Sequence, residues 1–161
     1  MKKIKPFLIN SENFSEFGTL LNPMECGEPL NPGSTYPYYN DRLPLSFSCC
    51  SLITLSVLVL NKRPLRIDVT EKHNYTEEIV GGFNSDVIFH AGAQRDVPVN
   101  NEFKAFILPK NWWVRFKKGV FHHAPFIFND ELATGFVILP PFTAFNDTIV
   151  FELQGEIELV I

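Results

Sequence analysis

Two stretches of this sequence combine imidazole and carboxylate side chains at spacings that suit proton transfer or metal binding. The first is residues 65–73, where strict alternation of apolar and polar residues predicts a β-strand with Thr70 on its outer face. If this strand continues, Glu71 and His73 point inward. A buried carboxylate or imidazole is costly unless it is paired, binds a metal ion or lines a cavity open to water. The alternative is a frayed strand end with both side chains in solvent.

The second stretch, residues 120–126, contains the dipeptide His122-His123. Neighbouring side chains on a strand face opposite sides, so at most one of these histidines shares the inner face. We expect it to be His122, because alternation with a period of two places His122 on the same face as Val120 and Phe126. A His-His pair is by itself a weak indicator of a site.

Glu78 follows His73 closely enough to return toward the same cavity. With the imidazoles it would form a mixed set of ligands suited to a divalent ion or to acid and base catalysis. Glu77 and Glu78 can instead form a solvated turn. His90 is more typical of a hydrogen-bonded interior histidine than of a site residue. The sequence contains no glycine-rich phosphate loop and no Gly-x-Ser-x-Gly nucleophile motif.

Length and composition limit the class of protein. The chain has 161 residues, of which 45% are hydrophobic and 20% charged, and this predicts one folded domain over residues 1–161. There are 14 Lys and Arg against 18 Asp and Glu, without a basic block, so nucleic acid is not an expected partner. The apolar stretch at residues 47–60 is interrupted by Ser and Thr and is shorter than the ~20 residues of a membrane helix. We therefore expect it in the core and expect no membrane contact.

The cysteines and the chain start favour a reduced, cytoplasmic setting. Three cysteines are too few for a disulfide framework and lack the spacing of a zinc knuckle. Cys49 and Cys50 lie in the apolar stretch and are predicted to be inert core thiols. The basic start lacks the apolar run and cleavage site of a signal peptide.

The abundance of aromatic residues, prolines and glycines predicts an all-β fold. Sixteen Phe, twelve Pro and nine Gly favour short strands and turns, as in a sandwich or barrel of the jelly-roll type. A short N-terminal helix is predicted at residues 11–18, where Asn10 or Ser11 caps the start and Gly18 ends it. The predicted strands cover residues 45–60, 65–70, 87–91, 103–108, 112–116, 120–126, 135–139, 148–153 and 156–161.

Residues 22–41 are rich in proline and glycine and are predicted to form a long loop. Loops of this length are often lids or partner contacts. The loop contains Tyr36, Tyr38 and Tyr39, and we expect these aromatic side chains to pack on the core rather than to contact a ligand.

The order of these features resembles the ureidoglycolate lyase family, formerly called ureidoglycolate hydrolase, which is a branch of the cupins. Residues 14–20 are similar to the family's Phe-x-x-Phe-Gly start, and residues 61–64 precede the strand as they do in the family. Glu71-Lys72-His73 resembles the family's Glu-Arg-His. Residues 119–126 are similar to its Gly-x-Trp-His-His-Pro, which is the most specific of these motifs.

The resemblance implies a cupin-type jelly-roll β-barrel that forms a homodimer. It also implies a carbon–nitrogen lyase that releases urea from ureidoglycolate, or a related small α-hydroxy acid derivative, to leave glyoxylate in purine degradation. The catalytic residues implied are His73, Glu78, His122 and His123.

The same resemblance suggests how the substrate is held. The binding candidates are Glu71, which would share proton transfer or orient His73, and Arg63, Lys104 and Arg115, which would contact the substrate carboxylate, with arginine preferred for its planar donor fork. A divalent metal is compatible with such a barrel and would be held by His73, Glu78 and His122.

The chain departs from the family pattern at several positions. Asn74 replaces a proline, Glu78 a glutamine and Phe121 a tryptophan, and residues 139–142 replace a basic, glycine-rich segment. The His-x-His of many cupins is also absent, so three histidines and one glutamate cannot be assembled at the usual spacing. Two alternatives to the lyase stay open: a non-catalytic cupin that binds a small metabolite, and a structural dimer whose site has diverged.

Overall fold

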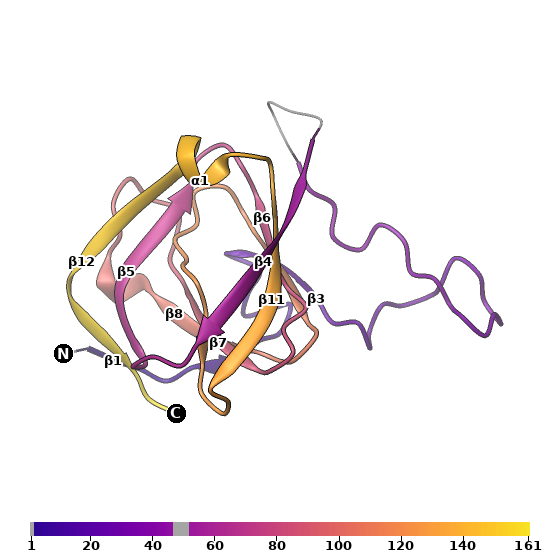
Figure 1. Ribbon diagram of the computed structural model, residues 1–161, viewed down its shortest axis with the longest axis horizontal. Coiled ribbons are helices and arrows are strands. Elements are labelled where there is room, and N and C mark those ends of the chain that lie inside the picture. The colour runs from indigo at the N-terminus through magenta and orange to yellow at the C-terminus, as the bar shows by residue number, and fades with distance from the viewer. Residues whose placement is uncertain (1, 47–51) are drawn as a thin grey trace.

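The protein is mostly β-structure in the computed structural model, which describes residues 2–46 and 52–161 (Figure 1). This agrees with the predicted all-β class. The helical elements described are a single 3-10 turn, η1 (Asn100–Glu102), and a short helix, α1 (Thr143–Asn146). No described helix has the length and apolar character needed to cross a membrane. The strands are β1 (Lys2–Ile4), β2 (Phe7–Leu8), β3 (Gly18–Leu21), β4 (Thr54–Asn61), β5 (Arg66–His73), β6 (Glu78–Gly81), β7 (Val87–Ala91), β8 (Lys104–Leu108), β9 (Trp113–Phe116), β10 (Phe126–Ile127), β11 (Leu132–Leu139) and β12 (Thr148–Leu159).

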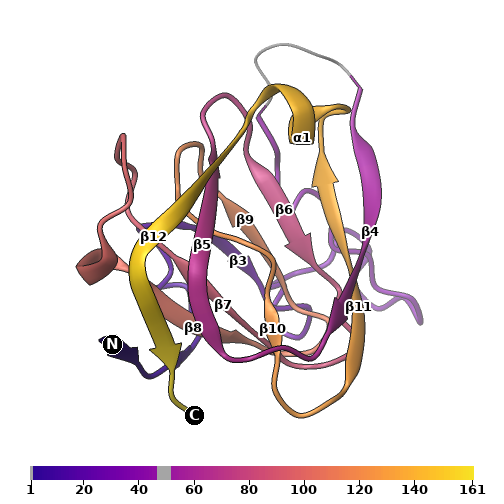
Figure 2. The ribbon, with the colours of Figure 1, turned by 60° about the vertical axis from the view of Figure 1, so that its left-hand side comes forward.

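The strands form three sheets. Their orders are β1-β12-β5, β10-β7-β8-β2 and β3-β9-β6-β11-β4. Figure 2 shows β5 and β12 on one side of the molecule and β6, β11 and β4 on the other. Strand β5 is joined to a distant segment by one isolated antiparallel bridge, between Glu71 and His122. This bridge is the contact that positions the candidate site.

Phenylalanine supplies much of the core between the sheets. Phe14 is fully buried and makes edge-on contacts with Phe89, Phe106 and Phe116, whose ring centroids lie 5.5 to 5.7 Å away. Edge-to-face packing at this distance is the geometry that aromatic pairs prefer. A second buried cluster includes Ile67 of β5 and Phe121. The phenylalanines whose abundance predicted short strands therefore form much of the observed core.

Most predicted strands are found within a few residues of their predicted limits. The two predicted at 148–153 and 156–161 are one strand, β12, whose pairing with β5 is irregular between Glu152 and Ile157. The predicted strand at 120–126 is not continuous, since only isolated bridges and β10 occur there. The strand predicted at 45–60 is found only from residue 54 onward, as β4; residues 45–46 and 52–53 are not in a strand, and Cys49 and Cys50 lie outside the described residues. Leu55, Val57 and Val59 are exposed, so the expectation that this stretch lies in the core is wrong for them. The sequence patterns did not predict β1, β2, β3 or β6.

The predicted helix at residues 11–18 is wrong, because this segment forms consecutive turns. The Asn10 side chain does cap it, accepting hydrogen bonds from the backbone N–H groups of Glu12 and Asn13. The Gly18 N–H donates to the carbonyl of Phe14, and Gly18 then begins β3. So short a segment gains too few hydrogen bonds to offset the cost of helix nucleation.

The long loop is confirmed, but two of its three tyrosines do not pack as expected. Residues 22–43 project away from the sheets (Figure 1), where Tyr36 and Tyr38 are exposed and Tyr39 is half-buried. The loop folds on itself instead: the Leu30 N–H donates to the Tyr38 carbonyl at 2.8 Å, and the Tyr38 N–H donates to Asn31 Oδ1 at 2.7 Å. The aromatic residues therefore remain free to contact another molecule.

The close packing of β11 on the core generates one prediction. A Cβ atom at Gly135 would lie 2.3 Å from Cδ1 of Phe83, whose side chain is fully buried. Gly135→Ala should lower the free energy of unfolding by about 1 to 3 kcal/mol because the ring must shift within a filled core. The measurement is chemical denaturation, with Thr134→Ala on the other face of β11 as the control. Equal stability of both variants would contradict this packing.

Candidate functional site

The candidate site forms where the end of β5, the start of β6 and residues 120–125 meet. The Glu71 N–H donates to the His122 carbonyl at 2.7 Å, and the His122 N–H donates to the Glu71 carbonyl at 2.9 Å. Strand β5 ends at His73 and β6 begins at Glu78, so the intervening turn brings Glu78 back beside His73. The structure thus brings together all four of these predicted residues.

Asp147, which sequence reasoning missed, holds the turn between β5 and β6. Its carboxylate accepts hydrogen bonds from the N–H groups of Asn74 at 2.9 Å and Tyr75 at 3.0 Å, and from the Thr76 hydroxyl at 2.8 Å. Asp147 follows α1 and lies far from the turn in sequence. No local pattern could have indicated its role, because the groups that donate hydrogen bonds to its carboxylate belong to a distant part of the sequence.

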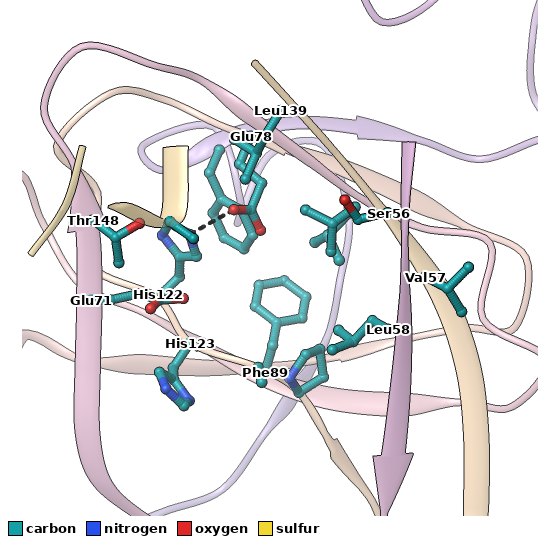
Figure 3. Close-up of a pocket in the computed structure, with 16 residues that line it drawn as sticks. Ser56, Val57, Leu58, Glu71, Glu78, Phe89, His122, His123, Leu139 and Thr148 are labelled. Atoms are coloured by element: carbon teal, nitrogen blue, oxygen red, sulfur yellow. Dashed lines mark ion pairs between the residues drawn. The ribbon is translucent and has the colours of Figure 1, made fainter. Parts of the chain in front are cut away.

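Glu78 lies between two imidazoles. Its Oε2 is 3.1 Å from Nε2 of His73. It is 3.6 Å from Nε2 of His122, the ion pair marked by the dashed line in Figure 3. All three residues are buried. Glu71, His73 and His122 also each offer a ligand atom, and these three atoms lie within 4.8 Å of one another. Two carboxylates and two imidazoles therefore converge on one small volume.

The backbone fixes the tautomers of the two imidazoles. Nδ1 of His73 lies 3.1 Å from the Asp147 carbonyl, and Nδ1 of His122 lies 2.9 Å from the Val120 carbonyl. A carbonyl oxygen only accepts hydrogen bonds, so each Nδ1 carries the hydrogen and each Nε2 of a neutral ring presents a lone pair toward Glu78. Nε2 of His122 is buried without a hydrogen-bond partner. Lone pairs and carboxylates that face one another need a proton or a cation between them.

The electrostatics of this cluster favour charge separation. Burial alone would raise the pKa of Glu78, but His122 and His73 outweigh it and lower this pKa to about 2. Burial likewise opposes the charged form of His73, but Glu78, the Asp147 carbonyl and Glu71 raise the His73 pKa overall. Without a metal ion, these two shifts favour a proton shared between His73 and Glu78, in the direction of a buried ion pair. A divalent cation would take the place of the proton on His73 Nε2.

A cavity of about 300 Å³ lies beside this cluster. Both His122 and His123 line it, so the expectation that at most one of them would share the inner face is wrong. An isolated bridge does not impose the alternation of a continuous strand, which leaves His123 free to turn toward the same space. Burial and the nearby charge of Arg63 lower the pKa of His123. The polar lining residues are Ser56, Glu71, Glu78, His122, His123 and Thr148, and the larger apolar ones are Leu58, Val80, Phe89, Phe116, Val137 and Leu139.

The three cationic candidates do not line this cavity. Arg63 Nη2 donates to the carbonyls of Ala124 and Pro125, and its guanidinium lies 4.0 Å from the ring centroid of Phe126. Lys104 pairs with Glu16 on the far sheet, at 3.1 Å. Arg115 contacts Glu77 at 3.7 Å and donates to the Thr19 hydroxyl. Their predicted contact with a substrate carboxylate finds no support in this arrangement.

Thr70 is buried, which corrects the expectation that it faces outward. Its hydroxyl donates to the His122 carbonyl at 3.1 Å and lies 3.0 Å from Nε2 of His90. His90 is 1% exposed, which confirms its predicted place in the interior. Burial lowers its pKa well below the usual 6.5, and electrostatic interaction with His123, His122 and Arg63 acts in the same direction. Both faces of β5 are therefore covered at this end.

His90 generates a prediction about pH. The folded protein keeps this imidazole neutral, whereas the unfolded chain binds a proton below its ordinary pKa of 6.5. The free energy of unfolding should therefore fall as pH drops from 6.5 to 5, with His90 contributing up to about 1.4 kcal/mol per pH unit. His90→Gln should reduce this slope. Denaturation at several pH values measures it, and identical slopes in both proteins would show that His90 is protonated when folded.

Comparison with known proteins identifies no relative: no protein-family model matches this chain, and no curated protein matches it. The resemblance to ureidoglycolate lyases therefore stays a prediction, carried by a few short motifs. The functional proposal below depends on the geometry of Glu71, His73, Glu78 and His122.

Proposed function

We propose that this protein is a cupin-type jelly-roll protein that uses a bound divalent cation to hold a small hydroxy acid. The candidate reaction is cleavage of ureidoglycolate to glyoxylate and urea. One observation carries the proposal: the Nε2 atoms of His73 and His122 face Glu78, with Glu71 alongside. In the neutral rings the hydrogen is on Nδ1, so both Nε2 atoms offer a lone pair. Imidazoles whose Nδ1–H groups donate to backbone carbonyls are typical metal ligands.

The residues that would hold the cation are Glu71, His73, Glu78 and His122. Glu71 stands two residues before His73 on β5, and its carboxylate and the His73 imidazole lie close enough to share a cation. A mixed nitrogen and oxygen set suits first-row divalent ions such as Mn²⁺, Fe²⁺ or Zn²⁺. When bound, the ion supplies positive charge to the carboxylate and hydroxyl oxygens of the ligand.

The charge of the cavity explains why an acid needs such an ion. Its described lining contains two glutamates and no lysine or arginine. A free anion would be repelled by Glu71 and Glu78, whereas a cation held by those side chains reverses the local charge. The cavity volume of about 300 Å³ is at the small end of ligand sites, which suits a metabolite of a few carbon atoms.

His123 is the best-placed group for proton transfer. It lines the cavity without belonging to the cation-binding set, and its lowered pKa keeps it neutral at pH 7. In this proposal His123 takes the proton of the substrate hydroxyl as the C=O bond forms and the C–N bond breaks. It then returns that proton to the departing urea nitrogen, which balances the reaction.

A non-catalytic metabolite-binding role is the second candidate. It is favoured by the largely apolar cavity wall and by the engagement of Arg63, Lys104 and Arg115 elsewhere. A binder needs the same cation set but no proton carrier. The two functions therefore differ in the effect of changing His123.

Cation binding has its own test. Mn²⁺ or Zn²⁺ added at 100 times its Kd should stabilise the folded protein by about 2.7 kcal/mol, measured by thermal unfolding and titration calorimetry. Glu78→Gln and His122→Ala should abolish the effect because each removes a ligand. His90→Gln, which changes a histidine outside the cavity, should retain it. An unchanged melting temperature with every divalent ion would remove the basis of the proposal.

Catalysis is tested by the release of glyoxylate from ureidoglycolate. Wild-type turnover should stop with a chelator and return with added metal. His123→Ala should lower kcat about 100-fold while leaving cation binding intact. If the wild type binds the cation and a small hydroxy acid but releases no glyoxylate, the binding role replaces the lyase.

A further inference from the structure

Among residues 2–46 and 52–161, the outer face of the five-stranded sheet is covered at one end and bare at the other. The strand register places Arg115, Ile79, Ile138 and Leu55 in one row across β9, β6, β11 and β4. The returning part of the long loop covers the first half: the Pro44 carbonyl accepts from Arg115, and the Ser46 N–H donates to Glu77 Oε2. Ile79 beneath it is only 5% exposed.

The other half of this face presents apolar side chains to solvent. Leu55, Val57 and Val59 of β4 are between 52% and 68% exposed, and Phe136 of β11, opposite Val57, is 37% exposed. Strand β4 is also an edge of the sheet. We call these four residues the bare face. A row of exposed β-branched and aromatic residues on an edge strand is an association surface or an aggregation liability.

The loop supplies a second unpartnered apolar surface. We call residues 22–43 the arm, which extends away from the sheets (Figure 1). Met24, Leu30, Tyr36 and Tyr38 of the arm are between 59% and 87% exposed. The arm nevertheless has a defined shape, since its own hydrogen bonds join Leu30, Asn31 and Tyr38 and several prolines stiffen it. A preformed arm loses little entropy on binding.

We propose that the arm of one copy of this chain lies on the bare face of a second copy, and that the arm of the second copy lies on the bare face of the first. In a dimer with two-fold symmetry the arm and the bare face of each copy are both buried, because each arm lies on the bare face of the other copy. The central part of the arm and strand β4 are both uncharged: residues 30–40 contain no Asp, Glu, Lys or Arg, and residues 52–60 contain none either. The charged residues of the arm, Glu25, Glu28, Asp41 and Arg42, flank that central part.

The area available is sufficient for a stable dimer. The eight side chains of the arm and the bare face together expose on the order of 1,000 Å² per copy, and a standard interface buries about 800 Å² per partner. The resemblance to ureidoglycolate lyases implies a homodimer without naming a surface. Our proposal identifies that surface from exposure and register, and it does not rest on the proposed function. Val57 also lines the candidate cavity, so the partner's arm would lie beside its mouth.

Sedimentation equilibrium of the full chain tests the proposal. The wild type should be dimeric at micromolar concentration. Val57→Lys in the bare face and the double variant Tyr36→Ser, Tyr38→Ser in the arm should each weaken dimerisation at least about tenfold. Val97→Lys, the same change at an exposed valine outside both surfaces, should leave the dimer intact. A monomeric wild type, or a dimer insensitive to the arm variant, would overturn the exchange of arms.

Photocrosslinking provides a test that needs no destabilising variant. A photoreactive phenylalanine analogue replaces Tyr38, and ¹⁴N- and ¹⁵N-labelled chains are mixed before irradiation. Crosslinks should join position 38 of one isotope to residues 52–61 or 132–139 of the other. Crosslinks within one chain only, or between the two arms, would show that the bare face has a different occupant.

Discussion

The antiparallel pairing of Glu71 with His122 is the contact on which the candidate site depends. Two backbone hydrogen bonds join these residues, and the Thr70 hydroxyl donates a third to the same His122 carbonyl. The segment around His122 is otherwise irregular, so few other backbone bonds hold it to β5. Because a long loop closure brings these stretches together, this pairing, with the Gly119 N–H that donates to the His73 carbonyl, keeps the imidazole of His122 beside both glutamates.

Buried charge is the second constraint. Glu71 and Glu78 bring two carboxylates into a site where the neutral imidazoles present lone pairs, so acceptors outnumber donors. Asp147 stabilises this arrangement twice: its carbonyl orients His73, and its carboxylate holds the turn that returns Glu78. Such a cluster is stable only with protons or a cation inside it. This requirement makes the site responsive to pH and to metal ions.

The two faces of the five-stranded sheet have separate roles. Alternation along β4 directs Leu58 and Ser56 into the cavity and Val59 and Leu55 outward. Strand β6, in the middle of the same sheet, carries Glu78 on the inner face. The cavity and the proposed interface therefore share one edge strand, and a change in the strand register would affect both.

The sequence by itself indicated the β class and the interior place of His90, and it offered the inward position of Glu71 and His73 as one of two alternatives. These follow from composition and from the period of two, which are local properties of the chain. Only the tertiary structure decided the return of Glu78, which relies on Asp147, and the turn of His123 into the cavity. Those outcomes depend on contacts between distant segments, and such contacts leave no local pattern because either partner alone is compatible with many environments.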